Sequence, residues 1–133
     1  MPTLSYVNVA TRDLDRLPRF YMDLFGFEEV REVQTPVFRA VLTGRTTIGF
    51  NAAAVYQTLN LPVPPESAAG TKLVLTFDVD SVGDVDSSII RAVSLGAKLV
   101  KPAFRTSYGY YQGVLLDPEA NGFRINTILQ QRL

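Results

Sequence analysis

Histidine and cysteine are both missing from the 133 residues of the sequence. Without them the chain lacks the usual general base near neutral pH and the nitrogen and sulfur ligands of zinc, iron, nickel or copper sites. Catalysis by Ser-His-Asp or Cys-His groups is excluded, and so are disulfide bonds. The only type of metal site that this composition does not exclude is one with oxygen ligands, such as a site for Mg²⁺ or Ca²⁺.

An excess of charge of one sign is also missing. The 13 lysine and arginine residues balance the 13 aspartate and glutamate residues, so no net field attracts nucleic acid or an anionic membrane. No apolar run approaches the roughly 20 residues of a membrane-spanning helix, and the N-terminal stretch lacks the pattern of a secretory signal. We therefore expect a cytoplasmic protein with neither nucleic acid nor a membrane among its partners.

The composition favours a folded, globular chain. Hydrophobic residues make up 47% and charged residues 20% of the sequence, close to the averages of soluble domains and sufficient for a core. The length predicts one compact domain, or two small modules that share one core.

The first part of the chain is predicted to form a strand, a helix and three further strands. Residues 4–10 alternate as a strand does, Asp13 stands where a helix N-cap would, and Gly26 supplies the C-terminal stop. The three further strands are predicted at 27–34, 38–42 and 46–51. Residues 52–71 contain three prolines and no periodicity, which indicates a connector.

The same order of elements then occurs again. A strand at 72–79 precedes Ser81 as N-cap, a helix at 82–95 and Gly96 as stop, and further strands are predicted at 98–101, 110–116 and 123–129. Matching elements lie about 68 to 75 residues apart, which indicates an internal duplication. Because each half is too small to bury its sheet alone, we expect an α+β fold in which two modules pair, with helices on one side and cupped sheets on the other.

Two stretches carry a resemblance to a known family. The run from Tyr6 to Phe27, YVNVATRDLDRLPRFYMDLFGF, resembles the opening module of the vicinal oxygen chelate superfamily, which includes glyoxalases, bleomycin resistance proteins and extradiol dioxygenases. The run from Leu116 to Asn126, LDPEANGFRIN, is similar to its final hairpin. The resemblance implies one domain over 1–133, with βαβββ modules at about 1–51 and 72–133 and a linker at about 52–71. It also implies a homodimer.

Members with metal chemistry place four ligands, commonly His or Glu, on the first and last strand of each module. The resemblance carries these places onto Tyr6, about Gly49, Val74 and Arg124. Such residues form no plausible zinc, nickel, manganese or iron site, and Arg124 would repel a cation. We therefore expect no metal and no cofactor, and glyoxalase or dioxygenase activity is disfavoured.

Strand parity predicts which side chains share a face of each sheet. Tyr6 shares its face with Asn8, Arg124 shares its face with Asn126, and the hairpin around Gly44 places Phe38 with Thr47. An aromatic stretch at 108–113 adds further rings. The predicted ligand-binding residues are Tyr6, Asn8, Phe38, Tyr110, Arg124 and Asn126. Rings, amides and one cation suit a planar, partly apolar ligand with an anionic or carbonyl oxygen.

Three functions stay open. The first is non-covalent sequestration of a small molecule, similar to that by bleomycin and mitomycin resistance proteins. The second is a metal-independent lyase, isomerase or cyclase, with Tyr6, Asp78 or Glu119 as proton carrier and Arg124 stabilising an enolate or carboxylate. The third is a protein-interaction subunit in which Tyr6, Arg124 and Asn126 close on one another.

Structural roles compete with binding for several of these residues. Arg124 could form an ion pair with a carboxylate such as Asp78 or Glu32. The Tyr6 hydroxyl could bond to Asn8 or Arg124 and fill the place of the metal. The tyrosines at 108–111 could pack across the sheet or in a subunit interface.

Overall fold

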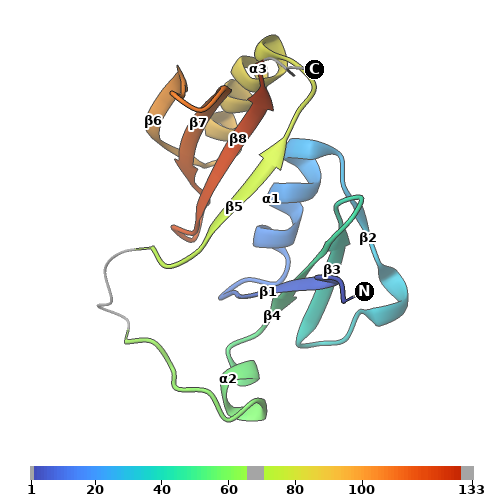
Figure 1. Cartoon of the computed structure of the whole chain (residues 1–133). Helices are drawn as coiled ribbons and strands as arrows, with labels where there is room; N and C mark the ends of the chain where they lie inside the picture. The colour runs from blue at the N-terminus through green and yellow to red at the C-terminus, as the bar shows by residue number, and fades with distance from the viewer. Residues whose placement is uncertain (1, 66–70, 130–133) are drawn as a thin grey trace. The chain divides into compact units, whose positions relative to one another are not determined.

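A computed structural model of the chain describes residues 2–65 and 71–129. It contains two compact units, Met1–Ala69 and Gly70–Leu133. Each unit is built in the order strand, helix and three strands (Figure 1). The predicted duplication and the α+β fold of two βαβββ modules are thus confirmed.

The first unit has one four-stranded sheet. Its elements are β1 (Tyr6–Ala10), α1 (Arg16–Phe25), β2 (Glu28–Glu29), the 3₁₀ helix η1 (Arg31–Val33), β3 (Phe38–Leu42), β4 (Thr47–Asn51) and α2 (Ala54–Thr58). The strand order is β1-β4-β3-β2, with β1 parallel to β4 and the other pairs antiparallel. The first and last strands of the module are therefore neighbours.

The second unit repeats this topology. Its elements are β5 (Val74–Asp78), α3 (Val82–Ser94), β6 (Lys98–Arg105), β7 (Tyr110–Leu116) and β8 (Gly122–Ile128). The order is β5-β8-β7-β6, again with the first and last strands parallel. Strands β5 and β8 are thus equivalent to β1 and β4.

In each unit one face of the sheet forms the core with a helix. The first core has these buried side chains from α1, β3 and β4: Leu17, Phe20, Tyr21, Leu24, Val41, Ile48 and Phe50. The second has these from α3, β7 and β8: Val85, Ile89, Ala92, Leu115, Phe123 and Ile125. Because side chains alternate along a strand, the residues between them lie on the opposite face, which we call the free face.

Three predicted elements differ from the structure. Of the strand predicted at 27–34, only Glu28–Glu29 is formed, and the rest of the prediction is wrong because a 3₁₀ helix follows. The apolar residues Phe27, Val30 and Val33 are spaced by three, which fits a 3₁₀ turn better than the two-residue period of a strand. The connector contains the short helix α2, and β6 continues four residues beyond its predicted end at Lys101, to Arg105.

The caps of the two long helices are formed differently. Helix α1 begins at Arg16 after Asp15, yet the Asp13 carboxylate accepts bonds from the backbone N–H groups of Asp15 and Arg16, both at 2.9 Å. These bonds lower the pKa of Asp13. Helix α3 begins after Ser81, as predicted, and the Ser81 hydroxyl accepts a bond from the Asp84 N–H at 3.1 Å.

Ser81→Ala is expected to lower the free energy of unfolding by about 1 kcal/mol, because one backbone donor at the start of α3 loses its partner. Urea denaturation measures the effect. Ser87→Ala is the matched control, since the exposed Ser87 hydroxyl only bonds the Asp84 carbonyl oxygen within the helix. Equal losses in the two variants would contradict the capping role.

Candidate functional site

The free face of the first sheet carries three of the predicted residues. Tyr6 and Asn8 lie on β1, Phe38 lies on β3, and the register places Asn8 opposite Gly49 and Phe38 opposite Asn51. The Tyr6 and Phe38 ring centroids are 6.5 Å apart. A Cβ atom on Gly49 would overlap Asn8 Oδ1 and lie 2.9 Å from Phe38 Cε1. Glycine at this position therefore lets Asn8 and Phe38 lie directly on the backbone of β4.

An amide pair fixes Asn8 on this face. Asn51 Nδ2 donates to Asn8 Oδ1 at 3.1 Å and to the Gly49 carbonyl oxygen at 3.4 Å. Asn51 was not predicted as a site residue. The hydroxyl of Tyr6 makes no hydrogen bond to Asn8 or to any other residue within 2–65 and 71–129, so the structural role suggested for it is not formed there.

The free face of the second sheet carries the other three predicted residues and a pair of cross-strand bonds. Arg124 Nε donates to Thr76 Oγ1 at 3.0 Å, and Asn126 Nδ2 donates to Asp78 Oδ1 at 2.8 Å. Both bonds join β8 to β5, two residues apart on each strand. Arg124 forms no ion pair with Asp78, Glu32 or another carboxylate in the described part of the chain. The N–H groups of its two terminal nitrogens are therefore not used in bonds within that part.

Asn126 has a buried oxygen without a donor. The residue is 5% exposed, and its Oδ1 atom has no hydrogen-bond partner among the described residues. The Asp78 carboxylate accepts from Asn126, and a carboxylate without a proton can only accept, which fixes Nδ2 toward β5 and Oδ1 away from it. Native proteins rarely leave such an atom unpaired, so Asn126 is an exception among the buried polar residues of the described chain.

The tyrosines at 108–111 divide between the two faces. Tyr110 lies on the free face, and its ring is 5.7 Å from that of Tyr108 in an edge-to-face arrangement. Tyr108 Oη accepts a bond from Gln112 Nε2 at 3.4 Å. Tyr111 points to the other face and donates to Asp86 Oδ1 on α3 at 2.7 Å, which raises the pKa of Tyr111. Tyr110 is therefore placed with the candidate site, and Tyr111 is structural.

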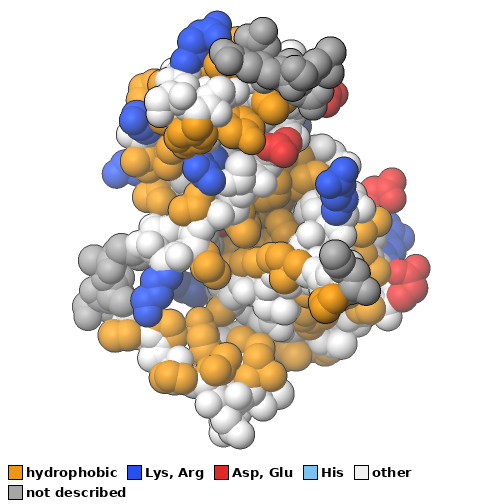
Figure 2. Space-filling model, viewed as in Figure 1, with side chains coloured by type: hydrophobic (Ala, Val, Ile, Leu, Met, Phe, Trp, Pro, Cys, Tyr) orange, Lys and Arg blue, Asp and Glu red, His pale blue; other side chains and the backbone are white. Residues whose placement is uncertain are grey.

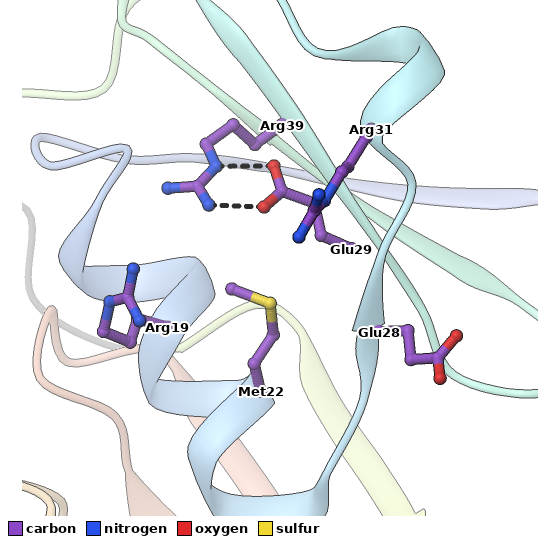
Figure 3. A pocket seen from close by; sticks show the side chains of 6 residues that line it. All are labelled: Arg19, Met22, Glu28, Glu29, Arg31 and Arg39. Atoms are coloured by element: carbon purple, nitrogen blue, oxygen red, sulfur yellow. Dashed lines mark hydrogen bonds and ion pairs between the residues drawn. The ribbon is translucent and has the colours of Figure 1, made fainter.

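A separate hollow lies in the first unit, between α1 and strands β2 and β3 (Figure 3). It has a volume of about 540 Å³. The lining residues are Arg19, Met22, Glu28, Glu29, Arg31 and Arg39. None of the predicted ligand-binding residues is among them.

Arg39 dominates this hollow through its ion pairs. Its Nε and Nη2 atoms bind the two carboxylate oxygens of Glu29 at 2.9 and 2.6 Å, and Nη1 bonds the Leu14 carbonyl oxygen and exposed Asp15. The bonds from Arg39 lower the pKa of Glu29. An arginine within the apolar strand Phe38–Leu42 was the signal that could have predicted this network.

Comparison with known proteins identifies the family. The sequence model of the glyoxalase-like domain family matches residues 6–126 of the chain. The chain belongs to the glyoxalase-like domain family. The resemblance to the vicinal oxygen chelate superfamily, predicted from the two sequence runs, is thereby confirmed. No curated protein matches this glyoxalase-like chain.

Solved structures share the fold of this glyoxalase-like domain. A glyoxalase/bleomycin resistance protein/dioxygenase family enzyme from Burkholderia phytofirmans PsJN is 43% identical, with a TM-score of 0.90 over 96% of this chain and 100% of that chain. A lactoylglutathione lyase from Agrobacterium tumefaciens is 23% identical (TM-score 0.70, 94% and 92% covered). The fosfomycin resistance protein FosX from Mesorhizobium loti is 19% identical (TM-score 0.70, 96% and 92% covered). The two lower identities show the fold alone.

The residues at the expected metal positions of this glyoxalase-like domain do not fit a metal ion. Gly49 and Val74 offer no side-chain donor, and the guanidinium of Arg124, bonded to Thr76, is a cation. Only the phenol of Tyr6 has an oxygen. Within residues 2–65 and 71–129, no three aspartate or glutamate side chains gather as a metal site.

Proposed function

We propose that this glyoxalase-like protein binds a small, planar, partly apolar molecule without a metal ion and releases it unchanged. The main support for this proposal is the presence of Arg124, a half-buried cation, at a position where metal-dependent members hold an acidic ligand. Only its Nε atom is bonded within the described chain, so the terminal nitrogens can meet an anionic or carbonyl oxygen of a ligand.

Aromatic and amide groups on the free faces support this proposal. Tyr6 and Phe38 in the first unit, and Tyr110 in the second, offer ring surfaces for stacking. Asn8 and Asn126 are each held by one bond, so their orientation is set before a ligand arrives. On the face of the molecule shown in Figure 2, lysine and arginine side chains are scattered rather than gathered in one patch, which favours a small ligand over a nucleic acid.

A metal-independent lyase, isomerase or cyclase is the second candidate. Asp78 favours it, because this exposed carboxylate lies on the free face beside the strand that carries Arg124. A carboxylate base and a guanidinium that stabilises an enolate would be the minimal arrangement. The third candidate, an interaction subunit, has less support, because Arg124 and Asn126 bond Thr76 and Asp78 and not each other.

A thermal-shift screen of planar metabolites and antibiotics, with and without divalent metal ions, tests the proposal. We expect stabilisation by compounds with an anionic or carbonyl oxygen, unchanged by metal ions or EDTA and lost in Arg124→Ala. Arg105→Ala is the matched control, since Arg105 pairs with Tyr111 on the opposite face. Stabilisation that requires a metal would contradict the proposal, and conversion of the bound compound would favour the enzyme.

The proposal includes a homodimer and a cytoplasmic location, both taken from the sequence-based expectations. In the part of the chain that the structure describes, no helix is long and apolar enough to cross a membrane. Size-exclusion chromatography with light scattering tests the oligomeric state. A monomeric mass at micromolar concentration would contradict the homodimer.

A further inference from the structure

The hollow between α1 and strands β2 and β3 brings together arginines from three different elements. Arg19 comes from α1, Arg31 from η1 and Arg39 from β3. Met22 of α1 supplies an apolar side chain to the same hollow (Figure 3). The volume of about 540 Å³ lies within the range of small-molecule sites, about 300–1,000 Å³. The hollow is therefore large enough for a small organic ligand.

This hollow lies on the opposite side of the first sheet from the predicted ligand-binding residues. Side chains alternate along β3, so Arg39 shares the helix-covered face with buried Val41, whereas Phe38 lies on the free face. None of the predicted ligand-binding residues lines the hollow. A ligand bound there would therefore occupy a second site, separate from that of the proposed function.

The acidic side chains of the hollow leave two arginines unpaired. Both carboxylate oxygens of Glu29 accept bonds from Arg39, at 2.9 and 2.6 Å. Glu28 is exposed, and its carboxylate points away from the other labelled side chains (Figure 3). The side chains of Arg19 and Arg31 form no hydrogen bond or ion pair within the described part of the chain. Two guanidinium groups thus line the hollow without a bonded anion.

The pKa of Glu29 shows that these two cations act on the same place. The hydrogen bonds and charge of Arg39 lower this pKa, and the charges of Arg31 and Arg19 lower it further. Like charges that converge without a counter-ion repel each other, and an anion bound between them removes this repulsion. Both side chains are exposed, so an anion can reach them from solvent. These observations favour an anion as the occupant of the hollow.

The two guanidinium groups favour a phosphoryl group over a carboxylate. A carboxylate has two oxygens in one plane, which the fork of a single arginine satisfies. A phosphoryl group carries about −1.5 to −2 charge at pH 7 and three acceptor oxygens, so it can accept bonds from arginines on two different elements. The thioether of Met22 and the aliphatic stems of the arginines offer apolar surface to an organic remainder. A phosphate monoester combines these two parts.

We propose that this hollow binds a small phosphate monoester, with its phosphoryl group between Arg19 and Arg31 and its organic part against Met22. The bonded pair of Glu29 and Arg39 joins β2 to β3 beside the ligand. This second site goes beyond the binding proposed for the free faces and does not depend on it.

Three probes test the site in protein that carries Arg124→Ala, which removes the unpaired cation of the free face. 2-Naphthyl phosphate has both parts, inorganic phosphate lacks the organic part, and 2-naphthoate has a carboxylate in place of the phosphoryl group. In isothermal titration calorimetry near neutral pH, we expect 2-naphthyl phosphate to bind at least about tenfold more tightly than either other probe. Equal affinity of inorganic phosphate would overturn the assignment of a monoester, and equal affinity of 2-naphthoate would overturn that of a phosphoryl group.

Substitution of the two unpaired arginines locates the bound probe. Arg19→Met and Arg31→Met, each added to Arg124→Ala, are expected to weaken binding of 2-naphthyl phosphate at least about tenfold, because each removes a charge-assisted bond. Arg45→Met is the matched control with the same loss of charge, since Arg45 is exposed in the turn between β3 and β4, outside the hollow. We expect this control to change the affinity less than about twofold, because distant surface charges are screened. An equal loss in Arg45→Met would indicate general attraction of an anion and would overturn the proposal.

The melting temperature distinguishes lost binding from lost folding. Without phosphate compounds, Arg19→Met and Arg31→Met are expected to keep the Tm of the parent protein within about 2 °C, because neither removes a bonded partner. 2-Naphthyl phosphate is expected to raise the Tm of the parent protein but not that of either variant. No binding of 2-naphthyl phosphate at millimolar concentration would overturn the proposal. The thermal-shift screen with Arg124→Ala tests the proposed function separately, because the two sites share no residue.

Discussion

Replacing Arg39 with methionine is expected to lower the free energy of unfolding by about 3 kcal/mol, measured by urea denaturation at pH 7. The side chains of Arg39 and Glu29 are only 10% and 14% exposed, and two parallel bonds join them. Methionine would leave the Glu29 carboxylate in this position without its cation. The Leu14 carbonyl oxygen would also lose its donor.

Two further variants distinguish the contribution of the ion pair to stability from that of the other residues of the hollow. Arg31→Met is the matched control, because Arg31 lines the same hollow and forms no bonded ion pair within the described chain (Figure 3). We expect it to change stability by less than about 0.5 kcal/mol. Adding Glu29→Met to Arg39→Met should restore part of the loss, because no unpaired charge is left. A loss in Arg31→Met equal to that in Arg39→Met would contradict the assigned role of the pair.

The same pair predicts a difference in pH dependence. Hydrogen bonding from Arg39 holds the pKa of Glu29 below its ordinary value of 4.5. Stability from a carboxylate with a lowered folded-state pKa is fully present above the unfolded-state pKa and is lost as the pH falls through the folded-state pKa. The stability gap between wild type and Arg39→Met should therefore be constant above about pH 5.5 and narrow below about pH 4.5.

Strand parity explains why most of the candidate site could be predicted from the sequence. Side chains alternate along any strand, so placing Tyr6 with Asn8, and Arg124 with Asn126, needs no knowledge of the neighbouring strands. The hairpin around Gly44 extends this reasoning to a second strand. With Leu42 opposite Thr47, the register also places Phe38 opposite Asn51, so Asn51 could have been placed on the same face as Phe38. Its bond to Asn8 depends on the parallel register of β1 and β4.

Other contacts could not be predicted in this way because they join segments far apart in the sequence. The bonds from β8 to Thr76 and Asp78 each span 48 residues and depend on the parallel register of β5 and β8. No turn sets that register, since a helix and two strands lie between the paired strands. The pairing of Arg39 with Glu29 depends in turn on β2, which is only two residues long and was predicted as part of a longer strand.

Reversing the charge at Arg124 is the substitution with the largest expected effect on binding. Arg124→Glu is expected to weaken binding of 2-naphthoate by at least about 100-fold, which corresponds to about 2.7 kcal/mol. Charge-assisted hydrogen bonds contribute about 1.5–3 kcal/mol each, and the new carboxylate would stand beside Asp78 and repel an anion. Titration calorimetry measures the change, and Arg105→Glu, on the opposite face of the sheet, is the control that should bind normally.

The same variant tests whether one acidic residue at position 124 is enough to bind a metal ion. Arg124→Glu restores an acidic residue where metal-dependent members have one, yet Gly49 and Val74 still offer no ligand atoms. We therefore expect no rise in Tm when Mn²⁺, Zn²⁺ or Ni²⁺ is added to Arg124→Glu. A metal-dependent rise of several degrees, removed by EDTA, would show that Arg124 alone keeps a cation out. No such rise is expected if the free faces bind their ligand through stacking, amides and one guanidinium.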